Sequence, residues 1–462
     1  MTAVRVGGRG GALAVAALPV AIGCGFALAW LGGRFEDAGP LVMVLLAVVP
    51  LLALGVVGQP LIGIFVVLGV FPRGFTPLPG LPLDLVQGTA VAVAVLILLR
   101  RVAARDEGAL WAPALWWGVA LFAWTLVGTP SAADPDLASR RLLISVSQFL
   151  LAVAVVAAAR SRRDVRIIAG ALVAVAAAVG ATTLGSAQQV DSAFGGAVVS
   201  GRATGIFSEP NQLGSFTGVA ALAGIGLALG LRSRRHRIAA GTFAALALVT
   251  LLLSLSRGAW IGFGVGMLVL VVSVPHARRV LGIGTLVLFV VALGYGALRP
   301  QSPEVHVIGE RFRSFAGEKN PYDSRPAIWA EARREIILDP FTGHGLGNFP
   351  LVAQRSTSKS HTAFPPHAHN LLLNWAAETG LPGVACILGL AAHLGVVVRR
   401  ALRRMRAEGR ARDAAVLAGL GGAALAVLGQ GFVDYTLWSS VVLAELWVVI
   451  GAIAAMLELE RR

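Results

Sequence analysis

Three short polar patches interrupt the long apolar runs of the chain, and each carries a side chain suited to anion binding or proton transfer. The first is Arg202 in the segment GRATG, the second is Arg257 in SLSRG, and the third is His369 in PPHAHN. Arginine is always charged and holds phosphate oxygens with paired N–H groups. A neutral imidazole can accept a proton from a hydroxyl. The three together are typical of a site that binds a diphosphate and activates an alcohol.

Arg257 is the most informative of the three. It lies between two apolar runs, 238–253 and 258–274, that are both short for a membrane span. An arginine at the bilayer centre costs about 2.5–3.5 kcal/mol on insertion scales, so it is expected to face a cavity and to pair with an anion. The alternative is an arginine that snorkels or lies in a loop. Arg202 alone would be ordinary, but two isolated arginines on one side suit a ligand with two phosphates.

His369 lies where a polar loop meets an apolar run, and we interpret it as a general base. A structural histidine is the alternative. A metal site built from His361, His367 and His369 is disfavoured, because carboxylates nearby are few and the spacing fits no standard site. We therefore expect no metal ion.

The composition identifies an integral membrane protein. Of 462 residues, 56% are hydrophobic and 14% are charged, and the mean hydropathy is +0.77. A soluble protein of this size could not cover so much apolar surface. The net charge is +15. We expect no nucleic-acid partner, since the arginines form short clusters between apolar runs and leave no basic face.

The apolar runs predict an all-α, polytopic transmembrane bundle of about 12–14 helices, since a span needs about 20 apolar residues. The first run is too long for the core of a signal peptide, and we interpret it as a membrane helix. Cys24 and Cys386 lie inside apolar runs and indicate neither a disulfide framework nor a metal motif. The runs are 11–33, 40–58, 60–72, 83–99, 113–127, 142–159, 165–183, 212–231, 238–253, 258–274, 280–298, 370–398, 413–431 and 438–457.

The distribution of arginine predicts the orientation. If the N-terminus is inside and the runs alternate, the inside segments carry 23 arginines and the short outside loops carry six. Every basic cluster then falls on one side, which is the positive-inside pattern. We therefore expect both termini in the cytoplasm and Arg202, Arg257 and His369 outside.

A long polar segment divides the chain into three parts. We expect transmembrane helices over 1–298, an extracytoplasmic catalytic loop over 299–369, and transmembrane helices with a cytoplasmic tail over 370–462. A loop of this length is usually functional. Inside it the sequence predicts a short helix over 326–338 that ends at Asp339-Pro340, followed by a tight glycine-rich turn.

These patches resemble those of the O-antigen ligase / O-antigen polymerase superfamily of bacterial lipid-linked glycan transferases. The most specific motif is His369-Asn370, followed after nine residues by Gly380-Leu381-Pro382-Gly383, and the resemblance covers roughly residues 200–400. The other segments that carry it are GRATG with Pro210-Asn211, Ser256–Trp260, Ser324-Arg325 with Trp329, Asp339-Pro340 and Gly343–Phe349.

The resemblance implies a membrane glycosyltransferase of the bacterial inner membrane. Such an enzyme moves a glycan from an undecaprenyl-diphosphate carrier to an acceptor hydroxyl on the periplasmic face. Arg202 and Arg257 would bind the diphosphate. His369 would be the catalytic residue, either as general base or as the residue that positions the acceptor. The diphosphate is already a good leaving group, so neither metal nor cofactor is expected. Supporting roles would fall to Arg325, His367 and Asn370.

Several functions remain open at this point. A ligase would transfer the glycan to an acceptor glycan or glycolipid such as lipid A-core, and a polymerase would extend the chain on its own carrier. A protein O-oligosaccharyltransferase shares the donor chemistry. A transporter would show paired charges or broken helices in repeat-related positions, and the sequence shows no such repeat.

Overall fold

The computed structural model describes residues 55–56, 58–73, 77, 83–104, 109–185, 189–194, 197–275, 277–278, 325–354 and 367–462. The predicted apolar runs 11–33 and 280–298, most of 40–58 and much of the 299–369 loop lie outside the described residues. The proposed division at 298 and 369 stays a prediction.

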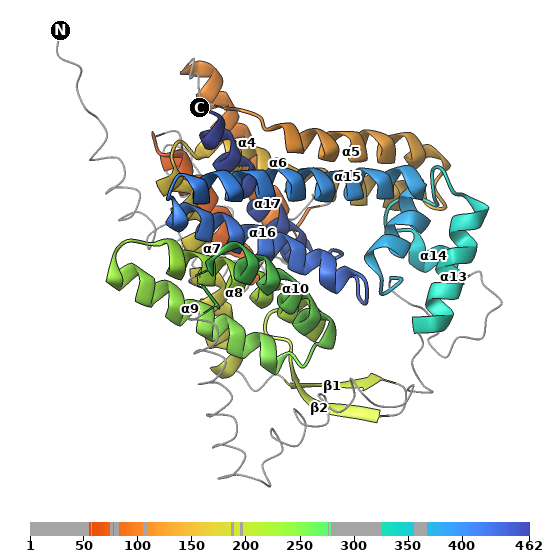
Figure 1. Cartoon of the computed structure of the whole chain (residues 1–462). Helices are drawn as coiled ribbons and strands as arrows, with labels where there is room; N and C mark the ends of the chain where they lie inside the picture. Colours follow the sequence, from red (N-terminus) through yellow and green to blue (C-terminus); the bar gives the residue numbers. More distant parts are fainter. Residues whose placement is uncertain are drawn as a thin grey trace, which may run out of the picture.

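Within the described residues the chain forms helices and one two-stranded hairpin (Figure 1). The α-helices are α3 (Pro60–Val70), α4 (Leu85–Ala103), α5 (Trp116–Gly128), α6 (Pro135–Ala158), α7 (Arg162–Gly185), α8 (Pro210–Gly230), α9 (Arg234–Leu253), α10 (Arg257–Ser273), α13 (Arg325–Leu338), α14 (Phe349–Gln354), α15 (Leu371–Ala407), α16 (Ala411–Gly431) and α17 (Ser440–Arg461). Short 3-10 segments are η1 (Phe71–Arg73), η2 (Pro113–Leu115) and η3 (Thr129–Ser131), and the strands are β1 (Gln189–Phe194) and β2 (Ala197–Ala203).

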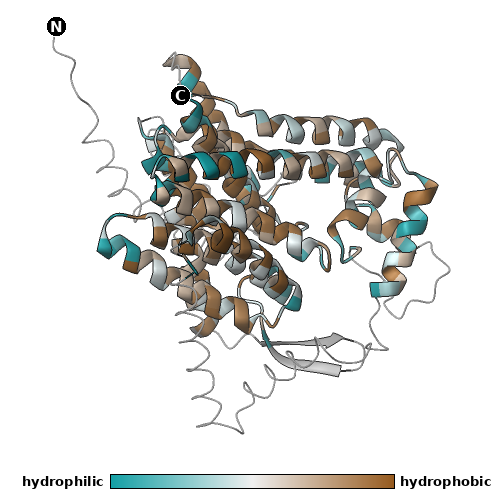
Figure 2. Ribbon diagram, viewed as in Figure 1, coloured by the Kyte–Doolittle hydropathy of each residue, from teal (hydrophilic) through white to brown (hydrophobic). Residues whose placement is uncertain are grey.

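The architecture is the predicted all-α membrane bundle. Eight of the described helices are long and apolar enough to cross a membrane, namely α4, α6, α7, α8, α9, α15, α16 and α17. Apolar residues dominate these helices, and polar residues gather toward the ends of α9 and α15 and along α13 (Figure 2). One difference concerns α9, which begins at Arg234, before the apolar run 238–253. Long basic side chains can extend a membrane helix in this way, because their charged heads reach toward water.

Helix α16 is the centre of the bundle, and it contacts α8, α10, α15 and α17. Two glycines of α10 explain one of these contacts. A Cβ on Gly262 would lie 2.4 Å from the carbonyl oxygen of Ala426, and a Cβ on Gly266 would lie 2.4 Å from that of Gly422. Small residues at these positions let two membrane helices approach backbone to backbone, where packing rather than hydrophobic transfer holds them together.

The segment between α7 and α8 contains the hairpin. Strands β1 and β2 pair antiparallel, with Val190 opposite Arg202 and an irregularity between Val190 and Ser192. The end of β2 leads directly toward the first turn of α8, so the hairpin brings Arg202 to the end of the bundle where α8 begins.

The predicted helix over 326–338 is confirmed as α13. Its buried residues Ile328 and Ala332 pack with Phe349 of α14 and Ala377 of α15. The glycine-rich turn that follows docks on α15 as well: the backbone N–H groups of His344 and Gly345 each donate a 2.9 Å hydrogen bond, to the carbonyl oxygens of Ala377 and Glu378. The short elements between α10 and α15 that the structure describes therefore form one layer over the first turns of α15.

Helix α15 is broken at Gly380, where the sequence indicated one continuous run. Gly380 has φ 70° and ψ 179°, and a Cβ there would lie 1.8 Å from the carbonyl oxygen of Phe341. Only glycine adopts this backbone conformation readily. The break separates a short segment, against which α13 and the glycine-rich turn pack, from a long segment that runs beside α5 to the other end of the bundle (Figure 1).

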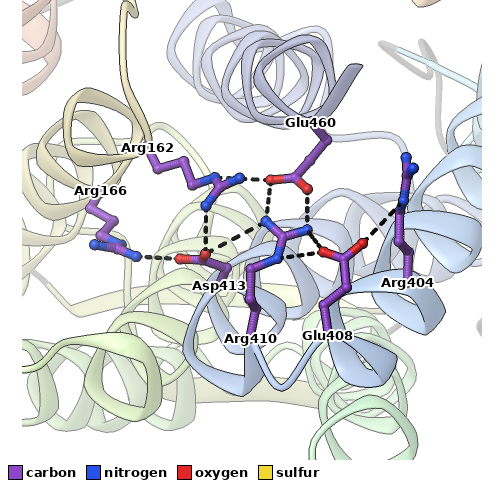
Figure 3. A network of polar contacts seen from close by, with 7 residues as sticks. All are labelled: Arg162, Arg166, Arg404, Glu408, Arg410, Asp413 and Glu460. Carbon is purple, nitrogen blue, oxygen red and sulfur yellow. Dashed lines mark hydrogen bonds and ion pairs between the residues drawn. The ribbon is translucent and has the colours of Figure 1, made fainter. Parts of the chain in front are cut away.

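An ion-pair network ties four helices together at the end of α16 remote from His369 (Figure 3). Asp413 of α16 pairs with Arg166 and, at 3.3 Å, with Arg162, both from α7. Arg410 pairs with Glu460 of α17, with Glu408 at 2.8 Å and with Asp413 at 3.9 Å. Arg162 also reaches Glu460 at 2.9 Å, and Arg404 of α15 pairs with Glu408 at 3.2 Å.

The break in α15 predicts an unequal response to two glycine substitutions on one helix. Gly380→Ala should destabilise the protein by at least about 2 kcal/mol, because alanine at this φ and ψ is strained and its Cβ meets the Phe341 backbone. Gly395→Ala is the matched control, since a Cβ there meets nothing within 4 Å. Thermal unfolding of the purified variants in detergent measures both. Equal midpoints for the two variants would contradict a break that requires glycine.

Candidate functional site

Three segments that are far apart in sequence meet at the start of α8. Arg202 is 2% exposed, and its Nε donates to the carbonyl oxygen of Ser254 at 3.1 Å. Its second amino group donates to Oδ1 of Asn211 at 2.8 Å. Asn211 in turn accepts a 3.1 Å hydrogen bond at its carbonyl oxygen from Gln430 of α16. Arg202 therefore links the hairpin, the start of α8 and the turn between α9 and α10.

The turn between α9 and α10 places Arg257 beside this junction. Ser256 begins α10, and its hydroxyl oxygen accepts a 3.3 Å hydrogen bond from the backbone N–H of Ala259. Arg257 is the first residue of the helix and is half-buried. A Cβ on the next residue, Gly258, would lie 3.0 Å from Val433. Arg257 thus sits where α10 rests on the turn that follows α16.

His369 is fixed on the other side of that turn. Its Nδ1 lies 3.0 Å from Oδ1 of Asp434, which is 3% exposed. The next residue, Asn370, caps α15 by accepting from the N–H of Leu373 at 3.0 Å, and it donates to the carbonyl oxygen of Phe432 at 2.8 Å. His369 itself has φ 48°, a conformation that costs energy for a residue other than glycine. Backbone strain of this kind is typical of a side chain held for function.

The charge on Asp434 determines which nitrogen of His369 is protonated. Burial would raise the pKa of Asp434, but the hydrogen bond and charge of His369, with further contributions from His367 and Arg325, hold it below its usual value. The carboxylate is therefore ionised at neutral pH and can only accept hydrogen bonds. The 3.0 Å contact then requires a proton on Nδ1 of His369, which leaves Nε2 of a neutral ring as the acceptor.

His367 is held in the opposite tautomer. It is 1% exposed, and its Nδ1 accepts a 3.2 Å hydrogen bond from the backbone N–H of His369. Burial, with a smaller effect of His369, lowers the pKa of His367 to about 3. The neutral ring therefore carries its proton on Nε2 and has no free lone pair to act as a base. Its ring lies edge-on to that of His369, with centroids 4.3 Å apart.

A second carboxyl group, Glu209, lies within electrostatic range of these residues. It immediately precedes α8. Burial is the main cause that raises its pKa, and repulsion from Asp434 adds to this, while His369 and Arg202 act in the opposite direction. The raised pKa favours the neutral acid, which reduces the repulsion that an incoming anion would meet here.

The structure thus gathers the residues singled out from the sequence around one turn, Gln430–Asp434. Two residues, His369 and Asn370, contact this turn directly by hydrogen bonds. Arg202 is linked to it through Asn211, which contacts Gln430. Arg257 is linked through its neighbour Gly258, and His367 through its hydrogen bond with His369. Arg325, the first residue of α13, acts on both His367 and Asp434 through its charge.

Two members of the site, Asp434 and Glu209, were missed from the sequence. Asp434 lies between the last two apolar runs, 413–431 and 438–457, and that position was the only sequence signal for it. Glu209 precedes Pro210, a typical start of a helix, which indicates a cap rather than a site. The contact of His369 with residue 434 crosses 65 positions of sequence, so spacing could not reveal it.

One group of described residues has ligand atoms close enough to hold a metal ion. Ligand atoms of His367, His369 and Asp434 lie within 4.8 Å of one another. In the structure these atoms are engaged with one another, since His367 Nδ1 accepts from the backbone of His369 and His369 Nδ1 contacts Asp434. His361, considered above as a ligand, lies outside the described residues. These hydrogen bonds fit an oriented imidazole.

Comparison with known proteins gives one family. Residues 242–388, about a third of the chain, match the family described as O-antigen ligase. The match includes Arg257, Arg325, His367, His369 and Asn370, whereas Arg202, Glu209 and Asp434 lie outside it. A search among curated proteins found no match.

The pKa of His367 predicts acid sensitivity that depends on this residue. Burial lowers the pKa of His367 in the folded protein to about 3, so between about pH 6.5 and pH 3 this residue binds more protons in the unfolded chain than in the folded one. The free energy of unfolding therefore decreases as the pH is lowered through that window. The slope is about 1.4 kcal/mol per pH unit. His367→Asn, which keeps an acceptor for the N–H of His369, should flatten the fall of the unfolding midpoint between pH 6.5 and 4.5. An unchanged slope would show that a different group titrates.

Proposed function

We propose that the chain, whose residues 242–388 match the O-antigen ligase family and support its place in the O-antigen ligase / O-antigen polymerase superfamily, transfers a glycan from a lipid-linked diphosphate to an acceptor hydroxyl. The observation that supports this most is the oriented pair His369–Asp434 beside two arginines, Arg202 and Arg257. A base and an anion-binding group on one turn are what this reaction requires.

The donor half of the reaction rests on the arginines. Transfer breaks the bond between the anomeric carbon of the glycan and the diphosphate oxygen, and the diphosphate leaves with the bonding electrons. Guanidinium groups stabilise the charge that develops on this leaving group through charge-assisted hydrogen bonds, each worth about 1.5–3 kcal/mol. Arg202 is already fixed by Ser254 and Asn211, so little side-chain entropy remains to be lost on binding.

The acceptor half rests on His369. Its Nε2 accepts the proton of the attacking hydroxyl while the hydroxyl oxygen bonds to the anomeric carbon. Asp434 holds Nδ1, which fixes the tautomer and stabilises the imidazolium that forms, as in other oriented histidine bases. His367 does not fit this role, because its free nitrogen carries a proton.

We further propose that the donor is an undecaprenyl-diphosphate glycan, that the site faces the periplasm, and that the acceptor is a glycan or glycolipid such as lipid A-core. The undecaprenyl carrier follows from the superfamily resemblance, and the arginine distribution supports the orientation. A polymerase uses the same donor chemistry, so the acceptor distinguishes the two functions.

The proposal predicts the products of a transfer assay. The full-length protein, reconstituted with an undecaprenyl-diphosphate glycan, should give a single product of higher mass that requires added lipid A-core. A ladder on the carrier without added acceptor would identify a polymerase instead. Donor binding without any product would contradict the proposed transfer.

The same assay tests for a metal requirement. Addition of EDTA should leave the rate unchanged, since His369 and the arginines supply the chemistry. A loss of activity that zinc or magnesium restores would establish the metal site.

The His369–Asp434 pair predicts a graded response to substitution. His369→Ala should abolish transfer and retain donor binding. Asp434→Asn should lower kcat by about 10²- to 10⁴-fold, because an amide no longer enforces a proton on Nδ1 or stabilises the imidazolium. Asp136→Asn, an exposed acid-to-amide change at the start of α6, is the matched control and should retain full activity. Equal rates for Asp434→Asn and Asp136→Asn would remove Asp434 from the mechanism.

A further inference from the structure

A long apolar cavity of about 680 Å³ runs along α15, away from the site described above. Its walls come from α5, α10, α15, α16 and α17, and almost all of its lining is hydrocarbon. One end lies at Leu371 and Trp375, in the first turns of α15. The other end is bordered by three arginines of α15, Arg399, Arg403 and Arg406.

The three arginines share one face of α15. Their spacing of four and three residues places them in line, and the same face continues toward the site through Gly395, Ala391 and Ile387, which also line the cavity. The intervening arginines Arg400 and Arg404 project from a different face and do not border the cavity. One helix face therefore presents an apolar stripe that ends in a cluster of three positive charges.

Four arginines near the cavity already have carboxylate partners. Arg162, Arg166, Arg404 and Arg410 all pair with carboxylates in the network of Figure 3. None of the three cavity arginines forms an ion pair with a carboxylate that the structure describes; Arg406 donates to the carbonyl oxygen of Val272 at 3.4 Å. Among the described residues, the charge at the mouth of the cavity therefore has no carboxylate to balance it, and it suits an anion from outside the chain.

We propose that this cavity is a binding site for an anionic glycerophospholipid of the leaflet on that side. Its phosphate lies against Arg399, Arg403 and Arg406, and an acyl chain lies along the apolar stripe. A cavity that opens to a bilayer is filled by hydrocarbon rather than by water. If the cavity stayed empty, the side chains that line it would lose dispersion contacts. Charge complementarity then selects the headgroup, because basic residues near the membrane surface attract anionic lipid. The inference does not depend on the proposed transfer activity.

The experiment compares two lipids that differ only in headgroup. Full-length protein in detergent is given equal amounts of phosphatidylglycerol and phosphatidylcholine with identical acyl chains, and bound lipids are counted by native mass spectrometry. The parent should retain phosphatidylglycerol at least fivefold over phosphatidylcholine. The triple variant R399Q/R403Q/R406Q should bring this ratio close to one. The matched triple variant R400Q/R404Q/R412Q removes the same charge from exposed positions outside the cavity and should keep the parental ratio.

A second pair of variants tests the acyl-chain part of the site. Gly395 borders the cavity and Gly264 does not, and a Cβ on either meets nothing within 4 Å. Gly395→Trp should lower the retention of both lipids several-fold, and Gly264→Trp should leave it unchanged.

Three outcomes would overturn the proposal. The first is equal retention of the two lipids by the parent, which would indicate hydrocarbon filling without headgroup recognition. The second is equal loss of selectivity in both triple variants, which would indicate a general surface charge. The third is unchanged retention in Gly395→Trp. If R399Q/R403Q/R406Q does not fold, R399K/R403K/R406K keeps the charge, and it should retain a preference for phosphatidylglycerol.

Discussion

The turn after α16 is the feature on which the candidate site depends. Polar groups at the ends of apolar helices have few partners available, and each one left unpaired away from water is costly. Residues 430–434 supply those partners to three other segments: Gln430 donates to Asn211, Phe432 accepts from Asn370, and Asp434 contacts His369. The pairing that stabilises this end of the bundle is therefore the same pairing that brings a base close to two arginines.

Local signals in the sequence predicted the elements well. The apolar runs indicated the membrane helices. For α13, a proline near the start and Asp339-Pro340 at the end predicted the helix. These features act through neighbouring residues, by burial and by backbone restriction. The sequence also selected Arg202, Arg257 and His369, because charged and titratable side chains beside membrane helices are rare enough to be informative.

The features that the sequence did not predict all depend on contacts between distant segments. Asp434 becomes part of the site only when α16 and α15 lie side by side. Gly380 was recognised as part of a motif, but the reason for glycine is the backbone of Phe341, which approaches from another segment. The sequence likewise could not show which arginines form ion pairs with carboxylates. That depends on the positions of Asp413 and Glu460, which lie on different helices.

The break at Gly380 connects the two ends of the molecule. The segment of α15 before it carries His369 and Asn370 at its start and packs against α13 and the glycine-rich turn. The segment after it forms one wall of the apolar cavity and ends in the basic cluster. In a continuous straight helix the two segments would share one axis. The break at Gly380 lets each segment take the direction in which it packs against its own neighbouring helices. The motif of His369-Asn370, nine residues and Gly380 thus has a structural meaning. The nine residues form about two and a half helical turns between the histidine and the break. This length of helix places the imidazole of His369 against Asp434.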